Sequence, residues 1–157
     1  MEFKTLKPIF KHLFNFVVLF SVSFSVSAKV ELLTGYVRAM PASVPNSAAY
    51  LSLSNQGEEI DLVSVQTNVA EEAQLHRLIE ENGMIKMRQA AKFTVPNNGE
   101  LTLVETGNHI MLIGLNRTLE VGNTVDLVLL FDNGETLPVS LPVKKQQHSA
   151  TAAHSHH

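Results

Sequence analysis

The sequence predicts an all-β sandwich or barrel. Between Glu31 and Val143, short runs rich in Val, Leu, Ile and Thr alternate with turn residues, as in AAYLSLSNQGEEIDLVSV, FTVPNNGELTLVETG and VDLVLLFDNGETLPVSLPV. Turn signals stand at 55–57, 82–83, 97–99 and 132–134, and Asn-Gly is the strongest hairpin marker among them. Strands at this spacing are typical of sandwiches and barrels. No helical period is long; only NVAEEAQL, residues 68–75, is compatible with one helical turn.

The first 28 residues have the features of a secretory signal peptide. Lys4, Lys7 and Lys11 precede an apolar run over 13–26, and Val26-Ser27-Ala28 ends in small residues suited to cleavage. The run is shorter than the roughly 20 residues of a membrane span, although an uncleaved anchor stays open as an alternative. We therefore expect a periplasmic protein that begins at Lys29 and has no stable membrane insertion after cleavage.

The remaining chain divides into a β domain over residues 29–143 and a polar, disordered tail over 144–157. The formal net charge of the whole chain is −3, and loss of the leader lysines makes the exported part more acidic. A nucleic-acid partner is therefore not expected, because phosphate binding requires a basic surface. The chain has no cysteine, so thiol and disulfide chemistry are excluded and methionine is the available sulfur ligand.

GNHIMLIGL, residues 107–115, places a histidine and a methionine on one face of an apolar strand. Alternate side chains of a strand point to the same side, so His109 and Met111 project together, whereas Ile110 and Leu112 project to the other side. Either residue alone is more often structural than functional. Together they offer an imidazole and a thioether, which is half of a soft-metal site.

A second pair arises in the predicted hairpin LHRLIEENGMIKMRQ, residues 75–89. With Asn82-Gly83 as a two-residue loop, Leu78 faces Met87, and His76 becomes a diagonal neighbour of Met87 on the same face. A four-residue loop would place His76 and Met87 directly opposite each other. A loop of three or five residues with a bulge would instead bring Met84 to that face.

If these strands meet, the two pairs form a His2Met2 pocket. Thioethers are soft, uncharged ligands that suit Cu(I), and the imidazoles add affinity. Zinc would prefer thiolate, carboxylate or more imidazole, and a blue-copper centre requires a cysteine. The residues therefore indicate a cuprous site.

The full spacing, H-x10-M-x21-H-x-M, resembles the signature of the periplasmic copper chaperones of the PCu(A)C family. The resemblance extends from about Leu33 to Val143, including YVRAMPASVPNSAAYLSLSNQGEEIDLVSV and GNHIMLIGLNRTLEVGNTVDLVLLF. It implies a cupredoxin-like Greek-key β-sandwich that binds one Cu(I). The ligands that it implies are His76, Met87, His109 and Met111.

The resemblance also implies delivery of copper to the CuA subunit of apo-cytochrome c oxidase, alongside or through a Sco-type thiol protein. Many members have a further methionine just after the first histidine, where this chain has Arg77 and Leu78. Fewer spare thioethers are therefore available. Met40, in the segment Arg38-Ala39-Met40-Pro41, could approach the site, but we expect it to be structural or peripheral.

Two other functions compete with copper delivery. A periplasmic copper-buffering or resistance protein is favoured by the tail histidines, His148, His154, His156 and His157, which as neutral imidazoles suit Cu(II). A purification-tag remnant or an inert tail stays open as an alternative, although the irregular spacing, with Ser and Ala between the histidines, is unlike an engineered run of six. A copper oxygenase with a histidine brace requires an amino-terminal histidine, whereas the expected first residue is Lys29. No nucleophile or phosphate-loop motif is present, so we expect no enzyme activity.

Overall fold

The computed structural model describes residues 30–145, which contain ten strands and no helix, and therefore no helix able to cross a membrane. The strands are β1 (Val30–Arg38), β2 (Asn46–Asn55), β3 (Ile60–Thr67), β4 (Ala70–Glu81), β5 (Met84–Gln89), β6 (Phe93–Val95), β7 (Glu100–Thr102), β8 (His109–Leu115), β9 (Thr124–Phe131) and β10 (Thr136–Lys144). The all-β prediction is confirmed. The predicted signal peptide and the four tail histidines lie outside the described residues.

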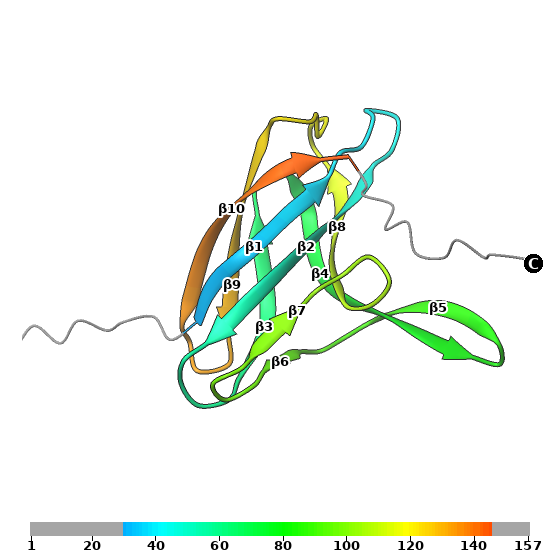
Figure 1. Cartoon of the computed structure of the whole chain (residues 1–157). Coiled ribbons are helices and arrows are strands. Elements are labelled where there is room, and N and C mark those ends of the chain that lie inside the picture. Colours follow the sequence, from blue (N-terminus) through cyan, green and yellow to red (C-terminus); the bar gives the residue numbers. More distant parts are fainter. Residues whose placement is uncertain (1–29, 146–157) are drawn as a thin grey trace, which may run out of the picture.

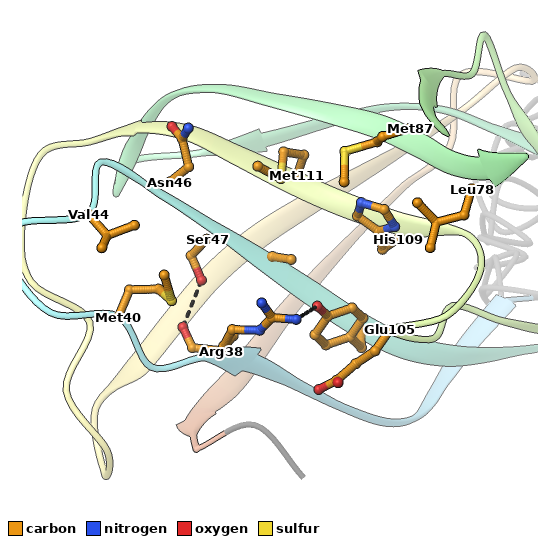
Figure 2. A pocket seen from close by; sticks show the side chains of 12 residues that line it. Arg38, Met40, Val44, Asn46, Ser47, Leu78, Met87, Glu105, His109 and Met111 are labelled. Atoms are coloured by element: carbon orange, nitrogen blue, oxygen red, sulfur yellow. Dashed lines mark hydrogen bonds between the residues drawn. The ribbon is translucent and has the colours of Figure 1, made fainter. Parts of the chain in front are cut away.

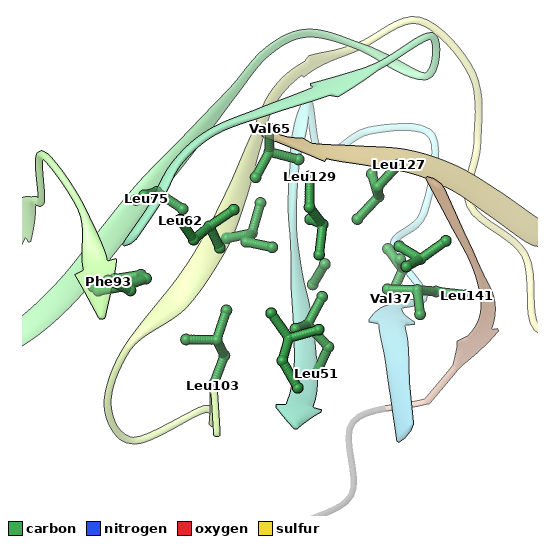
Figure 3. Packing of buried hydrophobic residues seen from close by; sticks show 14 of the residues in the cluster. Val37, Leu51, Leu62, Val65, Leu75, Phe93, Leu103, Leu127, Leu129 and Leu141 are labelled. Atoms are coloured by element: carbon green, nitrogen blue, oxygen red, sulfur yellow. The ribbon is translucent and has the colours of Figure 1, made fainter. Parts of the chain in front are cut away.

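The strands pair in the order β5-β4-β8-β2-β1-β10-β9-β3-β6, with β7 added beside β2 (Figure 1). Neighbouring pairs are antiparallel except β1 and β10, which run parallel and connect the two halves of the sheet. The sheet folds over, so that side chains from both halves meet in a single core (Figure 3). This is the cupredoxin-like sandwich that the family resemblance implied.

The core follows directly from the period of two in the strands. In β9, Val125, Leu127, Leu129 and Phe131 are buried, and the residues between them are exposed or partly exposed. Complete burial of one such side chain contributes about 1.5–3 kcal/mol. The core is entirely aliphatic and aromatic, so the fold does not depend on a metal-ligating side chain for its hydrophobic stabilisation.

The hairpin of β4 and β5 has the two-residue loop that the sequence predicted. Asn82 and Gly83 both have positive φ, 56° and 75°, as a type I′ turn requires. The resulting register pairs Leu78 with Met87 and Glu81 with Met84. In Figure 1 this hairpin extends away from the body of the sandwich. The alternative registers, including the one that would favour Met84, are excluded.

The possible helical turn at residues 68–75 is not present, because β4 already begins at Ala70. Here Ala73 and Leu75 pack toward the core, and Glu72 and Gln74 alternate with them on the outer face. Pairing with β8 satisfies the backbone of this segment. Tertiary pairing therefore outweighs the modest helical preference of Ala and Glu.

Candidate metal centre

The two histidines of the domain are direct neighbours on adjacent strands. His76 of β4 is paired with His109 of β8, and their ring centroids are 5.9 Å apart. Both lie on the face of the sheet opposite the core, because their neighbours Leu75 and Ile110 point inward. The ring of Tyr50 continues the row, with its centroid 6.3 Å from that of His109. The predicted meeting of the two ligand-bearing strands is therefore found.

His109 is held in a defined tautomer by a backbone carbonyl. Its Nδ1 lies 3.0 Å from the oxygen of Gly107, which only accepts, so Nδ1–H donates and Nε2 retains the lone pair. The residue is almost completely buried, which restricts the ring to this orientation. A ring nitrogen fixed in this way by its partner is the usual arrangement of a metal-binding histidine.

His76 is held in the opposite tautomer, with the proton on Nε2. Gln74 donates its amide nitrogen to Glu72, at 2.6 Å, and its carbonyl oxygen accepts from Nε2–H of His76, at 2.9 Å. Nδ1 of His76 is therefore the lone-pair nitrogen, and it is buried without a hydrogen-bond partner. Burial, and secondarily the nearby His109, lowers the pKa of His76, which favours the neutral form that coordinates metals.

A pocket of about 260 Å³ opens beside this pair of histidines, and His109, Met87 and Met111 all contribute to its wall (Figure 2). Met111 follows His109 on the same face of β8. Met87 comes from β5 and is 45% exposed, so its thioether is accessible from solvent. The structure thus brings three of the four predicted ligands to one pocket. The fourth, His76, lies directly beside His109.

Polar groups border the pocket on the side of β1 and β2. Arg38 donates to the hydroxyl of Tyr50 at 2.7 Å, and Tyr36 donates to Glu105 at 2.7 Å. Burial raises the pKa of both phenols, so they stay protonated. Tyr36 and Tyr50 are therefore hydrogen-bonding side chains at the border of the pocket rather than anionic ligands.

Met40, which the sequence left as structural or peripheral, lines the same pocket. The signal was available in Val37-Arg38-Ala39-Met40, where Val37 and Ala39 pack on the core and the alternate residues face outward. Within residues 30–145, no three residues among His, Cys, Asp and Glu are grouped so as to hold a metal ion. Metal binding at this pocket therefore depends on thioethers.

A family model described as "Putative lipoprotein LpqE-like" matches residues 30–143. The chain belongs to the LpqE-like family. A curated relative, "Putative lipoprotein Lxx21020" of Leifsonia xyli subsp. xyli, is 33% identical over 117 residues, which cover 73% of this chain and 69% of the relative. The present LpqE-like chain contains no cysteine.

Solved structures similar to this LpqE-like protein include DR1885 and several PCuAC domains. The solution structure of CuI-DR1885 from Deinococcus radiodurans has 36% identity and a TM-score of 0.62, over 78% of this chain and 83% of that chain. The apo PCuAC domain from PmoF1 has 20% identity and a TM-score of 0.65, over 76% and 96%. The likeness to the PmoF1 domain concerns the fold alone, whereas the likeness to DR1885 extends to the sequence.

Proposed function

We propose that this protein is a non-enzymatic carrier that binds one Cu(I) through His76, Met87, His109 and Met111. The observation that carries the proposal is the state of the two imidazoles. Each donates its N–H to a carbonyl oxygen, and each keeps one lone-pair nitrogen for another use. In His76 that nitrogen is buried and has no partner, a costly arrangement that a bound cation would relieve.

The donor set favours Cu(I) over other ions. Two neutral imidazoles and two thioethers are soft enough for Cu(I), whereas zinc sites use thiolates, carboxylates or additional imidazoles. The copper-loaded state of DR1885, named as its Cu(I) form, supports this choice through a relative of 36% identity. The copper-bound PCuAC domain from PmoF2 supports copper as the cargo of this fold.

We further propose that the protein works after export, in the periplasm, and passes Cu(I) to an apo-cuproprotein. The signal-peptide features of residues 1–28 and the lipoprotein names of the relatives support export. The family resemblance supports the CuA subunit of cytochrome c oxidase as the recipient, directly or with a Sco-type protein. A deletion strain should then lose oxidase activity at low copper and recover it when copper is added.

Copper buffering is the second candidate, favoured by the four tail histidines. It predicts the opposite phenotype, in which the deletion strain is sensitive to high copper and has normal oxidase activity at low copper. Growth and oxidase activity measured across copper concentrations in one strain pair therefore separate the two functions.

Binding is tested by anaerobic titration of Cu(I) against a competing chelator, followed by X-ray absorption. We expect one tightly bound ion with two nitrogen and two sulfur neighbours. His109→Ala should weaken binding at least about tenfold, equivalent to roughly 1.4 kcal/mol. Binding without sulfur neighbours, or binding unaffected by His109→Ala, would refute the assigned ligands.

A further inference from the structure

Met40 is held rigidly at the pocket, although it lies just after the end of β1. Its backbone nitrogen donates to the carbonyl of Leu119 at 3.1 Å, and the preceding Ala39 donates to Lys144 at 2.7 Å. Ser47 donates to the carbonyl of Arg38 at 2.7 Å. The thioether of Met40 therefore projects from a fixed backbone.

Met40 follows β1, which lies two strands away from the strand of Met111, β8, with β2 between them. Ala48 of β2 is paired with Met111 of β8, and Ala49 is paired with Val37 of β1. Arg38 therefore lies opposite Ala48, and Met40, two residues beyond Arg38 and bridged to Leu119, also lines the pocket. Ala48, which pairs with Met111, has a small side chain, and the pocket extends over it from Met111 to Met40.

The methionines line the pocket from its two ends. Met40 lies at the end away from Met87, and Met111 lies between them (Figure 2). A methionine that serves only as packing fills irregular gaps. Here about 260 Å³ beside the thioethers stays open, and that space is large enough to admit a metal ion together with a ligand atom of a recipient. The three thioethers of Met87, Met111 and Met40 therefore form a row of soft donors along the pocket.

We infer that Met40 is an exchange ligand, which binds Cu(I) transiently as the ion enters or leaves the histidine–methionine site. In this step a bond from copper to the sulfur of Met40 forms as the bond to Met87 breaks, while the bonds to His76, His109 and Met111 persist. Copper remains Cu(I), and no proton moves. The inference rests on the proposed function, since it concerns the entry and release of the same Cu(I) ion.

The test compares Met40→Leu with Met84→Leu in the otherwise complete protein. Both variants lose one thioether at nearly constant volume, but Met84 lies on the hairpin outside the pocket and is 57% exposed. Each protein is loaded with one Cu(I) under anaerobic conditions, and transfer to excess bicinchoninate is followed by absorbance. Equilibrium affinity is measured in parallel, and circular dichroism melting compares folding.

Met40→Leu should slow transfer by roughly tenfold, which corresponds to about 1.4 kcal/mol in the barrier, with little change in affinity. Met84→Leu should match the wild type. Equal transfer rates for the wild type and Met40→Leu would overturn the exchange role alone. An affinity loss in Met40→Leu as large as that in Met111→Leu would also overturn it, because Met40 would then be a permanent ligand. A wild-type protein that takes up no Cu(I) would overturn both this inference and the proposed function.

Discussion

His76 and His109 stand directly opposite each other on β4 and β8, with their rings 5.9 Å apart on the face of the sheet that the core does not use. Pairing across strands fixes this separation, because opposed β-carbons lie about 4.5–5.5 Å apart. The imidazole pair is therefore set by the sheet itself before any metal binds. The thioethers contribute the part of the site that is open to solvent.

The hairpin register predicts unequal effects for its two methionines. Met87→Ala should weaken Cu(I) binding at least about tenfold, or roughly 1.4 kcal/mol, because Met87 lines the pocket. Met84→Ala should leave affinity unchanged, because Met84 pairs with Glu81 at the loop end of the hairpin. Competition titration of the two variants is the measurement, and equal losses would contradict the assignment of Met87.

Substitutions at two neighbouring residues of β8, Leu112 and Met111, should affect folding stability and metal binding separately. Leu112→Ala removes a fully buried side chain and should cost about 2–5 kcal/mol of unfolding free energy. Met111→Ala should cost much less stability but should abolish tight Cu(I) binding. Chemical denaturation of the metal-free proteins checks the first statement, and titration checks the second.

Metal-free wild-type protein should keep its β-sheet circular dichroism, because its core is wholly apolar. A zinc finger, in contrast, unfolds without metal. An unfolded spectrum for the metal-free form would show that the site contributes to the fold.

Gly35→Ala should destabilise the domain by about 1–3 kcal/mol, the usual cost of overpacking. A β-carbon there would lie 2.8 Å from Leu141, 2.9 Å from the β-carbon of Leu51 and 3.0 Å from a backbone oxygen. Gly107→Ala is the control, because its new β-carbon meets only a methyl group of Val104, at 3.2 Å. Thermal melting of the two variants should show the larger loss for Gly35→Ala.

Asp61 should contribute to stability at neutral pH and lose that contribution in acid. Its hydrogen bonds with Lys92 and Thr94 lower the pKa of the carboxyl below the ordinary 3.8. The folded state therefore binds fewer protons than the unfolded state, so stability falls as the pH drops below about 3.8 and through the folded pKa. Asp61→Asn should be less stable at pH 7 and should show a shallower acid decline.

Glu120→Gln is a suitable control for this acid titration, since it removes an exposed carboxylate of equal charge from the loop before β9. Denaturation curves at several pH values between neutral and pH 3 provide the measurement. An acid decline in Asp61→Asn as steep as that of the wild type would contradict the role given to Asp61.

The histidines at 148–157 lie outside the described residues and keep their prediction of a Cu(II) site. Full-length protein should bind additional Cu(II) relative to a version ending at Lys145, and this difference should fade below about pH 6.5 as the imidazoles protonate. Paramagnetic resonance at pH 7.5 and pH 5 is the measurement. Equal Cu(II) uptake by both proteins would eliminate a tail site.

Local patterns were sufficient to predict the all-β class and the hairpin register, whereas the cupredoxin-like arrangement was implied by the family resemblance. The period of two defined the strands, Asn82-Gly83 defined the hairpin register, and together they placed His76 and Met87 on one face. Sequence alone did not establish that β4 lies beside β8, because pairing of distant strands depends on the whole topology. The position of Met40 at the pocket was left open for the same reason, since β2 lies between β1 and β8.

The parallel pairing of β1 and β10 determines from which end this protein can be attached to something else. Arg38 is paired with Lys144, so the last described strand finishes beside the pocket, whereas Val30 lies about 26 Å away at the other end of β1. A fluorophore, affinity tag or solid support joined before Val30 is attached at the end of β1 remote from the pocket. The pocket then stays accessible to other molecules. The same attachment made after Lys145 starts next to the pocket, where its own bulk competes with any molecule that approaches the thioethers.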